Sequence, residues 1–169
     1  MYYFYKMTDV ELIIGFCESN QIKNYTINDD NSIDVDGNVS FFIRYTSKIP
    51  IKFNKVTGYF VINYGRDAYL ESLENSPREI GGNFNVSNIK LKSLKGAPNF
   101  VGGNFYCYNN DISSLEYFPN FVDGNVELFS NPIESLDGYT GNYRRLMVDN
   151  KEKLVRKHKL NNLFKNDKR

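Results

Sequence analysis

A unit of about 21 residues recurs along the chain and constrains its fold more than any other feature. Each unit opens with a glycine, followed by one variable residue and then an apolar residue. The steps between successive units are 21, 24, 21 and 21 residues, and the longer step places three extra residues in the segment NYGRDAY. A fixed period of this length is typical of proteins built from stacked, similar turns. The five glycines are Gly37, Gly58, Gly82, Gly103 and Gly124.

Apolar residues hold constant positions relative to these glycines, two and four residues after them, two before them, and in the return segment. Alternation of apolar and polar residues after the glycine predicts a short strand with one buried face. Prolines at three equivalent positions suit a return segment that needs no ladder hydrogen bond. The apolar positions are Val39, Phe60, Phe84, Phe105, Val126; Phe41, Ile62, Val86, Cys107, Leu128; Val35, Val56, Ile80, Val101, Val122; and Ile49, Leu73, Leu94, Leu115, Leu136.

A single turn of this length cannot bury its own apolar side, so the turns must stack on one another. Stacking converts each column of apolar residues into a continuous ridge inside the molecule. Full burial of one Leu or Phe contributes roughly 1.5–3 kcal/mol, so several per turn are needed to offset the entropy lost on ordering the chain. The sequence therefore predicts an α+β repeat protein, a solenoid of about five turns.

Two units carry a more specific motif, Phe105-x-Cys107-x-x-Asn110-x-Ile112 and its counterpart from Val126 to Ile133. This motif resembles the L-x-L-x-x-N-x-L core of leucine-rich repeats. Residues 24–139 resemble the short leucine-rich-repeat-like proteins common in tailed-phage genomes. The resemblance implies that Asn110 and Asn131 hydrogen-bond backbone groups at the bend after the strand. Ile89 stands at the corresponding position in the preceding unit. It also implies a small phage accessory protein that binds and inhibits a host or defence protein.

The array, residues 37–141, is flanked by two segments that we predict to contain helical caps. Residues 1–36 form the N-terminal cap, with a helix at about 8–19 opened by a capping box of Thr8 and Glu11, and short strands at 25–27 and 33–35. Residues 142–169 form a basic C-terminal helix or tail, helical at about 149–164. Its apolar stripe is Leu154, Val155, His158 and Leu163.

Chemistry-bearing residues are sparse, and we expect no catalytic activity, cofactor or metal site. The single histidine, His158, lies in a Lys/Arg-rich segment, and Cys107 occupies an inward column. Zinc-ligand spacings and phosphate-binding glycine motifs are absent from the sequence. The acidic segment does not have the EF-hand order, so turn formation accounts for it better than calcium binding. The residues of that segment are Asp29, Asp30, Asn31, Asp34 and Asp36.

Outward strand positions suggest a protein-binding surface, because three of them in adjacent units are aromatic. Exposed aromatic residues that lie together typically mark an interface. The alternative is that the C-terminal helix covers them, or that they are scattered over the surface. The candidate protein-binding residues are Phe42, Tyr106, Tyr108, Glu127 and Phe129.

Charge is divided unevenly, since residues 142–169 carry a net +7 and residues 1–141 a net −6. The basic segment is therefore an alternative surface, for nucleic acid or another anionic partner. A solvated helix with favourable charges near its C-terminal end is the simpler interpretation. The candidate residues for an anionic partner are Arg144, Arg145, Lys153, Arg156, Lys157 and Lys159.

The cysteine content, the N-terminal segment and the length of the apolar runs indicate the cell compartment. Two cysteines 90 residues apart do not form a disulfide framework, which favours a reducing environment. The N-terminal segment does not read as a signal peptide, and no apolar run is long enough for a membrane helix. We expect a cytoplasmic protein, in the host cytoplasm if phage-encoded, with a host protein as partner and no membrane association.

Overall fold

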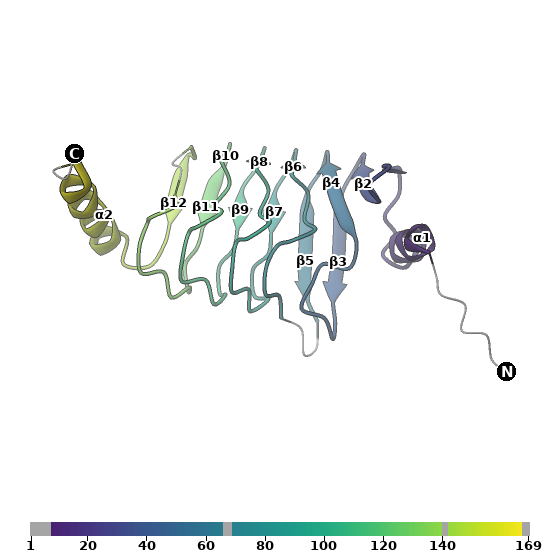
Figure 1. The fold of residues 1–169 in the computed structure, drawn as a ribbon, viewed down its shortest axis with the longest axis horizontal. Helices are drawn as coiled ribbons and strands as arrows, with labels where there is room; N and C mark the ends of the chain where they lie inside the picture. The colour runs from purple at the N-terminus through teal and green to yellow at the C-terminus, as the bar shows by residue number, and fades with distance from the viewer. Residues whose placement is uncertain (1–7, 66–68, 140–141, 167–169) are drawn as a thin grey trace.

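The computed structural model describes residues 8–65, 69–139 and 142–166, and its strands stand side by side along the long axis of the molecule (Figure 1). The fold is a β-solenoid of about five turns with parallel strands, and a short helix lies at each end. The predicted solenoid is therefore confirmed. Residues 66–68, in the segment predicted to hold the insertion, lie outside the described residues.

In the part of the chain that the structure describes, two six-stranded sheets run along the solenoid. Among the described strands every neighbouring pair is parallel except β1 and β2, the two short strands predicted before the array, which form an antiparallel hairpin. Sheet A consists of β1 (Tyr25–Ile27), β2 (Ser32–Val35), β4 (Lys52–Val56), β6 (Glu79–Ile80), β8 (Phe100–Val101) and β10 (Phe121–Val122). Sheet B consists of β3 (Val39–Ile43), β5 (Phe60–Tyr64), β7 (Phe84–Asn85), β9 (Phe105–Tyr106), β11 (Asn125–Glu127) and β12 (Arg145–Met147).

The register of sheet B matches the sequence columns. Phe84 pairs with Phe60 on one side and with Phe105 on the other, and Phe105 pairs with Val126. Residues two positions after each repeat glycine therefore meet across neighbouring turns. The predicted period is a structural period.

Each turn contributes two strands, whereas the sequence pattern predicts one. The column two residues before the glycine forms strands of its own, which make up sheet A. Val101, for example, pairs with Ile80 and with Val122. A glycine corner separates the sheet A strand of a turn from its sheet B strand.

Sheet B continues beyond the predicted end of the array at residue 141. Strand β12 pairs with β11 in parallel, with Leu146 opposite Val126. Arg144 occupies the position of the repeat glycine, and its N–H donates to the Gly124 carbonyl at 3.0 Å. The first part of the predicted basic segment is thus a sixth strand of the sheet.

Apolar side chains from both sheets and from the return segments fill the interior. Phe60, Phe84 and Phe105 are each 0% exposed, and their rings lie 5.8 and 5.4 Å apart in succession. The predicted return-segment column is buried as well, including Leu73 and Leu115 at 0% exposure. One hydrophobic cluster extends through the solenoid from Ile13 to Leu154.

Close packing of the backbone at the corner requires glycine at Gly58, Gly82, Gly103 and Gly124, whereas a Cβ on Gly37 would meet nothing within 4 Å. The Gly124 N–H donates to the Gly103 carbonyl at 3.0 Å, and the Gly103 N–H donates to the Gly82 carbonyl at 3.0 Å. A Cβ on Gly124 would overlap Asn104 Oδ1 and lie 2.7 Å from the Gly103 carbonyl oxygen. A side chain at Gly124 would therefore force these two turns apart.

Two buried asparagines connect neighbouring turns at the bends that follow β9 and β11, as the resemblance to leucine-rich repeats implies. Asn110 Oδ1 accepts from the N–H groups of Ile89 and Leu91 at 3.0 and 3.1 Å, and its Nδ2 donates to the Val86 carbonyl at 2.8 Å. Asn131 makes equivalent bonds one turn later. These side chains satisfy backbone groups that the bend would otherwise leave without partners.

Helix α1 (Asp9–Ser19) begins at the predicted capping box, in which Thr8 and Glu11 exchange hydrogen bonds. Ile13 and Cys17 are buried, and the Phe16 ring lies 5.2 Å from that of Phe41. Val10, Leu12 and Ile14 of this helix are exposed although they are apolar.

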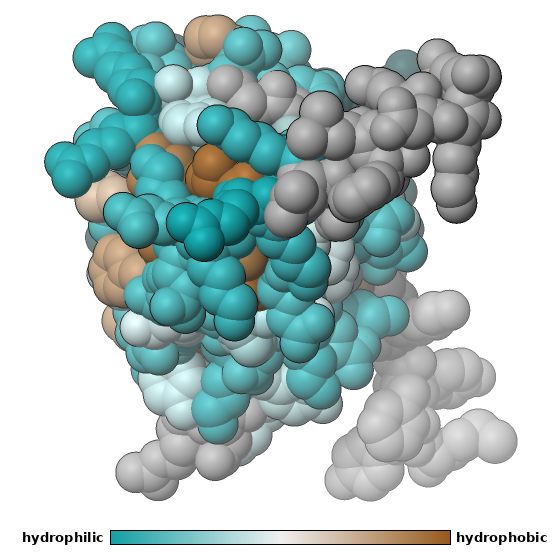
Figure 2. All heavy atoms as spheres, turned by 90° about the vertical axis from the view of Figure 1, so that its left-hand side faces the viewer, coloured by the Kyte–Doolittle hydropathy of each residue, from teal (hydrophilic) through white to brown (hydrophobic). Residues whose placement is uncertain are grey.

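Helix α2 (Lys151–Asn166) begins two residues later than predicted. Leu154 is buried and Val155 packs against the core, whereas the side chain of Leu163 lies outside the described part. Figure 2 views the molecule from this end, where hydrophilic side chains dominate and hydrophobic atoms show between them.

Candidate functional site

The predicted aromatic surface centres on Tyr108 and Phe129, which stack face to face with ring centroids 4.7 Å apart and planes 6° from parallel. Both residues occupy the same position of adjacent turns, five residues after the repeat glycine. Parallel pairing of β9 with β11 brings equivalent residues of the two turns side by side. The stack is therefore a direct consequence of the repeat register.

Tyr106 and Glu127 extend this surface along the two strands, because they pair directly across β9 and β11. The Tyr106 hydroxyl accepts a hydrogen bond from Asn104 Nδ2 at 2.9 Å, which orients the ring. Phe129 is 36% exposed, and the other three side chains are partly exposed. We call Tyr106, Tyr108, Glu127 and Phe129 the aromatic surface.

Phe42 does not belong to the aromatic surface, although the sequence pattern groups it there. It lies in β3, and the strands β5 and β7 separate it from β9. The Phe42 side chain is 58% exposed, with the Arg44 guanidinium 5.9 Å from its ring centroid. Ser87, at the same outward position in its turn, is buried, and its Oγ accepts from the Tyr108 N–H at 3.2 Å.

A second aromatic pair, which the sequence pattern did not predict, lies on the outer face of sheet A. Phe100 and Phe121 stack at 5.3 Å with planes 3° from parallel, and they are 41% and 39% exposed. A signal for this pair exists in the sequence, since a phenylalanine precedes the apolar valine in both turns. This pair provides a matched comparison for the aromatic surface.

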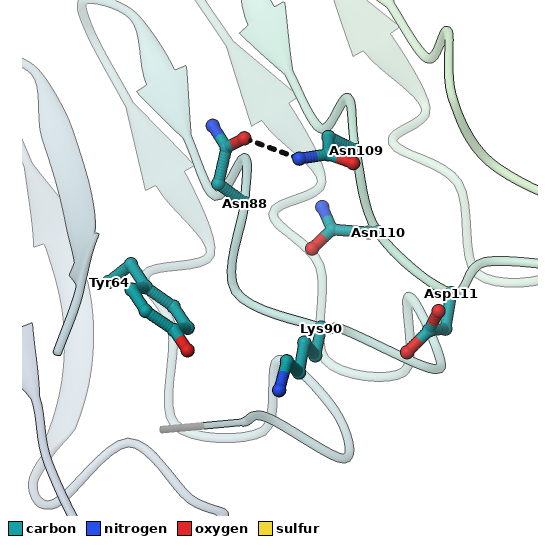
Figure 3. Close-up of a pocket in the computed structure, with 6 residues that line it drawn as sticks. All are labelled: Tyr64, Asn88, Lys90, Asn109, Asn110 and Asp111. Atoms are coloured by element: carbon teal, nitrogen blue, oxygen red, sulfur yellow. Dashed lines mark hydrogen bonds between the residues drawn. The ribbon is translucent and has the colours of Figure 1, made fainter. Parts of the chain in front are cut away.

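A hollow of about 370 Å³ lies beside sheet B, between β5 and the bends that follow β7 and β9 (Figure 3). Residues with polar side chains line it, and an Asn109 Nδ2 to Asn88 Oδ1 hydrogen bond of 2.7 Å crosses one side. The amide of Asn110 is already used by backbone groups of its own and the preceding turn. The other lining residues are Tyr64, Lys90 and Asp111.

The predicted basic residues do not form one cluster. Arg144 faces the Asp123 carboxylate at 3.7 Å, and Arg145 belongs to β12. Lys157 donates to the Glu134 carbonyl at 3.0 Å, which holds α2 against the last return segment. Lys153, Arg156 and Lys159 on α2 are also exposed.

An open groove of about 670 Å³ follows α2 at the end of the solenoid. Partly buried Val155 contributes its apolar surface, and cationic side chains border it. Lys151, which also lines the groove, donates to the Leu146 carbonyl at 3.0 Å. The remaining lining residues are Glu152, Arg156 and Lys159.

The two cysteines are packing residues in this structure. Cys107 is fully buried, and desolvation raises the pKa of its thiol to about 12, although a hydrogen bond from Asn110 lowers it somewhat. Burial also raises the pKa of Cys17 to about 11. At neutral pH both thiols stay protonated and shielded from reagents.

The acidic segment between residues 29 and 36 forms turn and cross-turn hydrogen bonds. Asp30 accepts from the Ser32 backbone N–H at 3.1 Å, and Asp36 accepts from the Thr57 hydroxyl at 2.9 Å. A hydrogen bond from Lys52 is the main cause that lowers the pKa of Asp30 below its usual range. Within residues 8–65, 69–139 and 142–166 no group of three or more His, Cys, Asp or Glu side chains is placed to hold a metal ion.

His158 lies at the junction of α2 with the last return segment. Its Nδ1 is 3.3 Å from an oxygen of the Asp137 carboxylate. The described part of the chain contains no helix with the length and apolar character needed to cross a membrane.

Comparisons of the chain with protein-family models, with curated proteins and with solved structures gave no match.

Proposed function

We propose that this protein is a non-catalytic protein-binding module and that the aromatic surface of sheet B contacts the partner. The partly exposed stack of Tyr108 on Phe129 is the observation that supports this proposal most strongly. Aromatic side chains supply a large contact area, and their few rotatable bonds lose little entropy on binding. Stacking and the parallel sheet already restrict these two rings, so less conformational freedom remains to be lost.

The partner surface that fits best is apolar with a hydrogen-bond donor or a cation near its edge. The stacked rings offer an apolar patch, while Glu127 adds a carboxylate beside it. The phenol ring of Tyr106 contributes apolar area and a hydroxyl that already accepts one bond. Such a centre of aromatic rings with a polar rim matches the usual composition of a protein interface.

We extend the proposal to the kind of protein. The buried Asn110 and Asn131 support a leucine-rich-repeat-like identity, and contacts of Phe16 and Leu154 with the core support helical caps at both ends. On the sequence resemblance, the protein is a phage accessory product that inhibits a host or defence protein in the host cytoplasm. That part of the proposal depends on the resemblance alone.

The alternative function is binding of nucleic acid or another anionic partner through the basic C-terminal segment. The groove beside Val155, with Arg156 and Lys159 at its edge, supports it. Lys157 is already engaged with the Glu134 carbonyl, which leaves it less available for an anion.

Affinity capture from a bacterial host lysate tests the protein-binding proposal. Tagged full-length protein is compared with Tyr108→Ala/Phe129→Ala and with Phe100→Ala/Phe121→Ala, which removes the matched pair on sheet A. We expect the sheet B variant to lose a specific partner that wild type and the sheet A variant retain. Equal recovery by all three proteins would contradict the proposal. A partner lost at high salt but retained by both variants would favour the basic segment.

A further inference from the structure

The charges of this protein are concentrated at the two opposite ends of the solenoid. Residues 8–36, which comprise α1 and the β1–β2 hairpin, contain seven acidic residues and one lysine, a net charge of −6. Residues 142–159, at the other end, contain seven Lys/Arg and two acidic residues, a net charge of +5. Figure 1 shows α1 and α2 at opposite ends of the long axis.

The acidic end is one continuous surface, because α1 is tied to the hairpin turn. Asn31 Nδ2 donates to the Asp9 carboxylate at 3.2 Å across the two segments. Exposed acidic residues on this surface include Glu18 and Asp29. The same helix exposes apolar side chains, since Val10 is 42%, Leu12 50% and Ile14 38% exposed.

The basic end offers a complementary feature, the open groove of about 670 Å³ along α2. Its apolar part comes from Val155 and its border from the cations Lys151, Arg156 and Lys159, while Glu152 adds a carboxylate. An apolar surface bordered by cations suits a helix that exposes both apolar and acidic side chains. Helix α1 is such a helix on the same chain.

We propose that the molecules associate head to tail, with the acidic α1 end of one copy bound at the basic α2 groove of the next. The two surfaces differ, so the contact is heterologous. A pair of bound copies still has one unoccupied acidic end and one unoccupied basic end. Association therefore continues into an open chain instead of stopping at a closed dimer. This inference is independent of the aromatic surface, which remains on the sides of the solenoid and would be repeated along the chain.

Sedimentation of the full-length protein at several concentrations tests the proposal at low salt (about 0.02 M) and high salt (about 0.5 M), because screening shortens electrostatic attraction. At low salt we expect the mean mass to rise above 19.6 kDa with concentration and to keep rising past the dimer. At high salt the mass should fall toward that of the monomer. A monomer at every concentration, or a dimer that does not grow, would overturn the proposal.

Charge-reversal variants locate the contact. Glu18→Lys/Asp29→Lys alters the acidic end and Arg156→Glu/Lys159→Glu alters the groove, and each should lower the association constant about tenfold or more. Glu71→Lys/Glu116→Lys reverses two exposed charges in the middle of the array and should associate like wild type.

Mixing the two end variants provides a test that a folding defect cannot imitate. Each variant alone should be largely monomeric, because its two ends have become more alike in charge. A 1:1 mixture should associate again, because the unaltered acidic end of the groove variant fits the unaltered groove of the other variant. Failure of the mixture to associate would overturn the proposal. Binding of a single-stranded oligonucleotide to wild type, but not to the groove variant, without self-association would overturn it in favour of an anionic partner.

Discussion

Asn131 binds the backbone of the preceding turn, where its Oδ1 accepts a hydrogen bond from the Ile112 N–H at 3.0 Å. Its Nδ2 donates to the carbonyls of Cys107 and Leu128 at 2.8 and 3.0 Å. Asn131→Ala would leave these buried groups without a partner, at about 1–3 kcal/mol each. We expect a loss of at least about 2 kcal/mol in the free energy of unfolding, measured by urea denaturation.

Asn120→Ala is the control for this substitution, because Asn120 is exposed in the return segment just before β10. A surface change of this kind is expected to alter stability by less than about 0.5 kcal/mol. If Asn131→Ala were as stable as Asn120→Ala, the asparagine contacts would not hold the turns together.

Two glycine substitutions should change stability in opposite directions. A Cβ on Gly103 would overlap Asn83 Oδ1 and lie 2.8 Å from the Gly82 carbonyl carbon, so Gly103→Ala should destabilise the protein by about 1–3 kcal/mol. Gly15 lies within α1, where a Cβ would meet no other part of the described chain within 4 Å, so Gly15→Ala should stabilise it by about 0.5–1 kcal/mol. Thermal unfolding of both variants checks the signs. A neutral Gly103→Ala would contradict the close approach of turns at the corner.

Thiol labelling tests the burial of the two cysteines. Because burial raises the pKa of Cys17 to about 11 and of Cys107 to about 12, both thiols are protonated at pH 8. We expect neither to react with iodoacetamide in the folded protein and both to react after unfolding in urea. Mass spectrometry counts the modified residues. Rapid labelling of native Cys107 would show that the interior of sheet B is open to reagents.

The last strand of sheet B is capped by a lysine at the start of α2. Lys151 Nζ donates to the Leu146 carbonyl of β12 at 3.0 Å, and Lys153 lies two residues further along the same first turn. Both lysines lie in the first turn of α2, where the helix dipole disfavours a positive charge to a similar extent. The difference in unfolding free energy between Lys151→Met and Lys153→Met therefore reports the hydrogen bond. Lys151→Met should be less stable by about 0.5–1.5 kcal/mol in urea denaturation. Equal stability of the two variants would mean that this bond does not hold the edge strand.

Sequence periodicity predicted the strands of sheet B because each unit has two alternating apolar positions after its glycine, and these positions repeat in register from unit to unit. Sheet A was not recognised as a second sheet, since each unit has a single constant apolar position before its glycine, whereas two alternating apolar positions follow the glycine. An alternation of period two cannot be read from one position. Strand β12 was missed because Arg144 stands where the earlier units have a glycine.

The candidate site was predicted in part for the same reason. Tyr108 and Phe129 come from adjacent turns, so their common position in the repeat was enough to bring them together. Phe42 shares that position but lies three strands away from Tyr108 in the sheet. A repeat position specifies the face of a sheet, and distance along the array decides which residues on that face meet.

Photo-crosslinking from the aromatic surface tests the central claim most directly, because it leaves the Tyr108–Phe129 stack intact. A benzoylphenylalanine at position 127 replaces Glu127, beside the stack, and one at position 79 replaces Glu79, which is exposed on the outer face of sheet A. In bacterial host lysate, irradiation should give one covalent adduct from position 127 and none of that mass from position 79. An adduct from position 79 alone, or equal adducts from both positions, would contradict recognition through the aromatic surface.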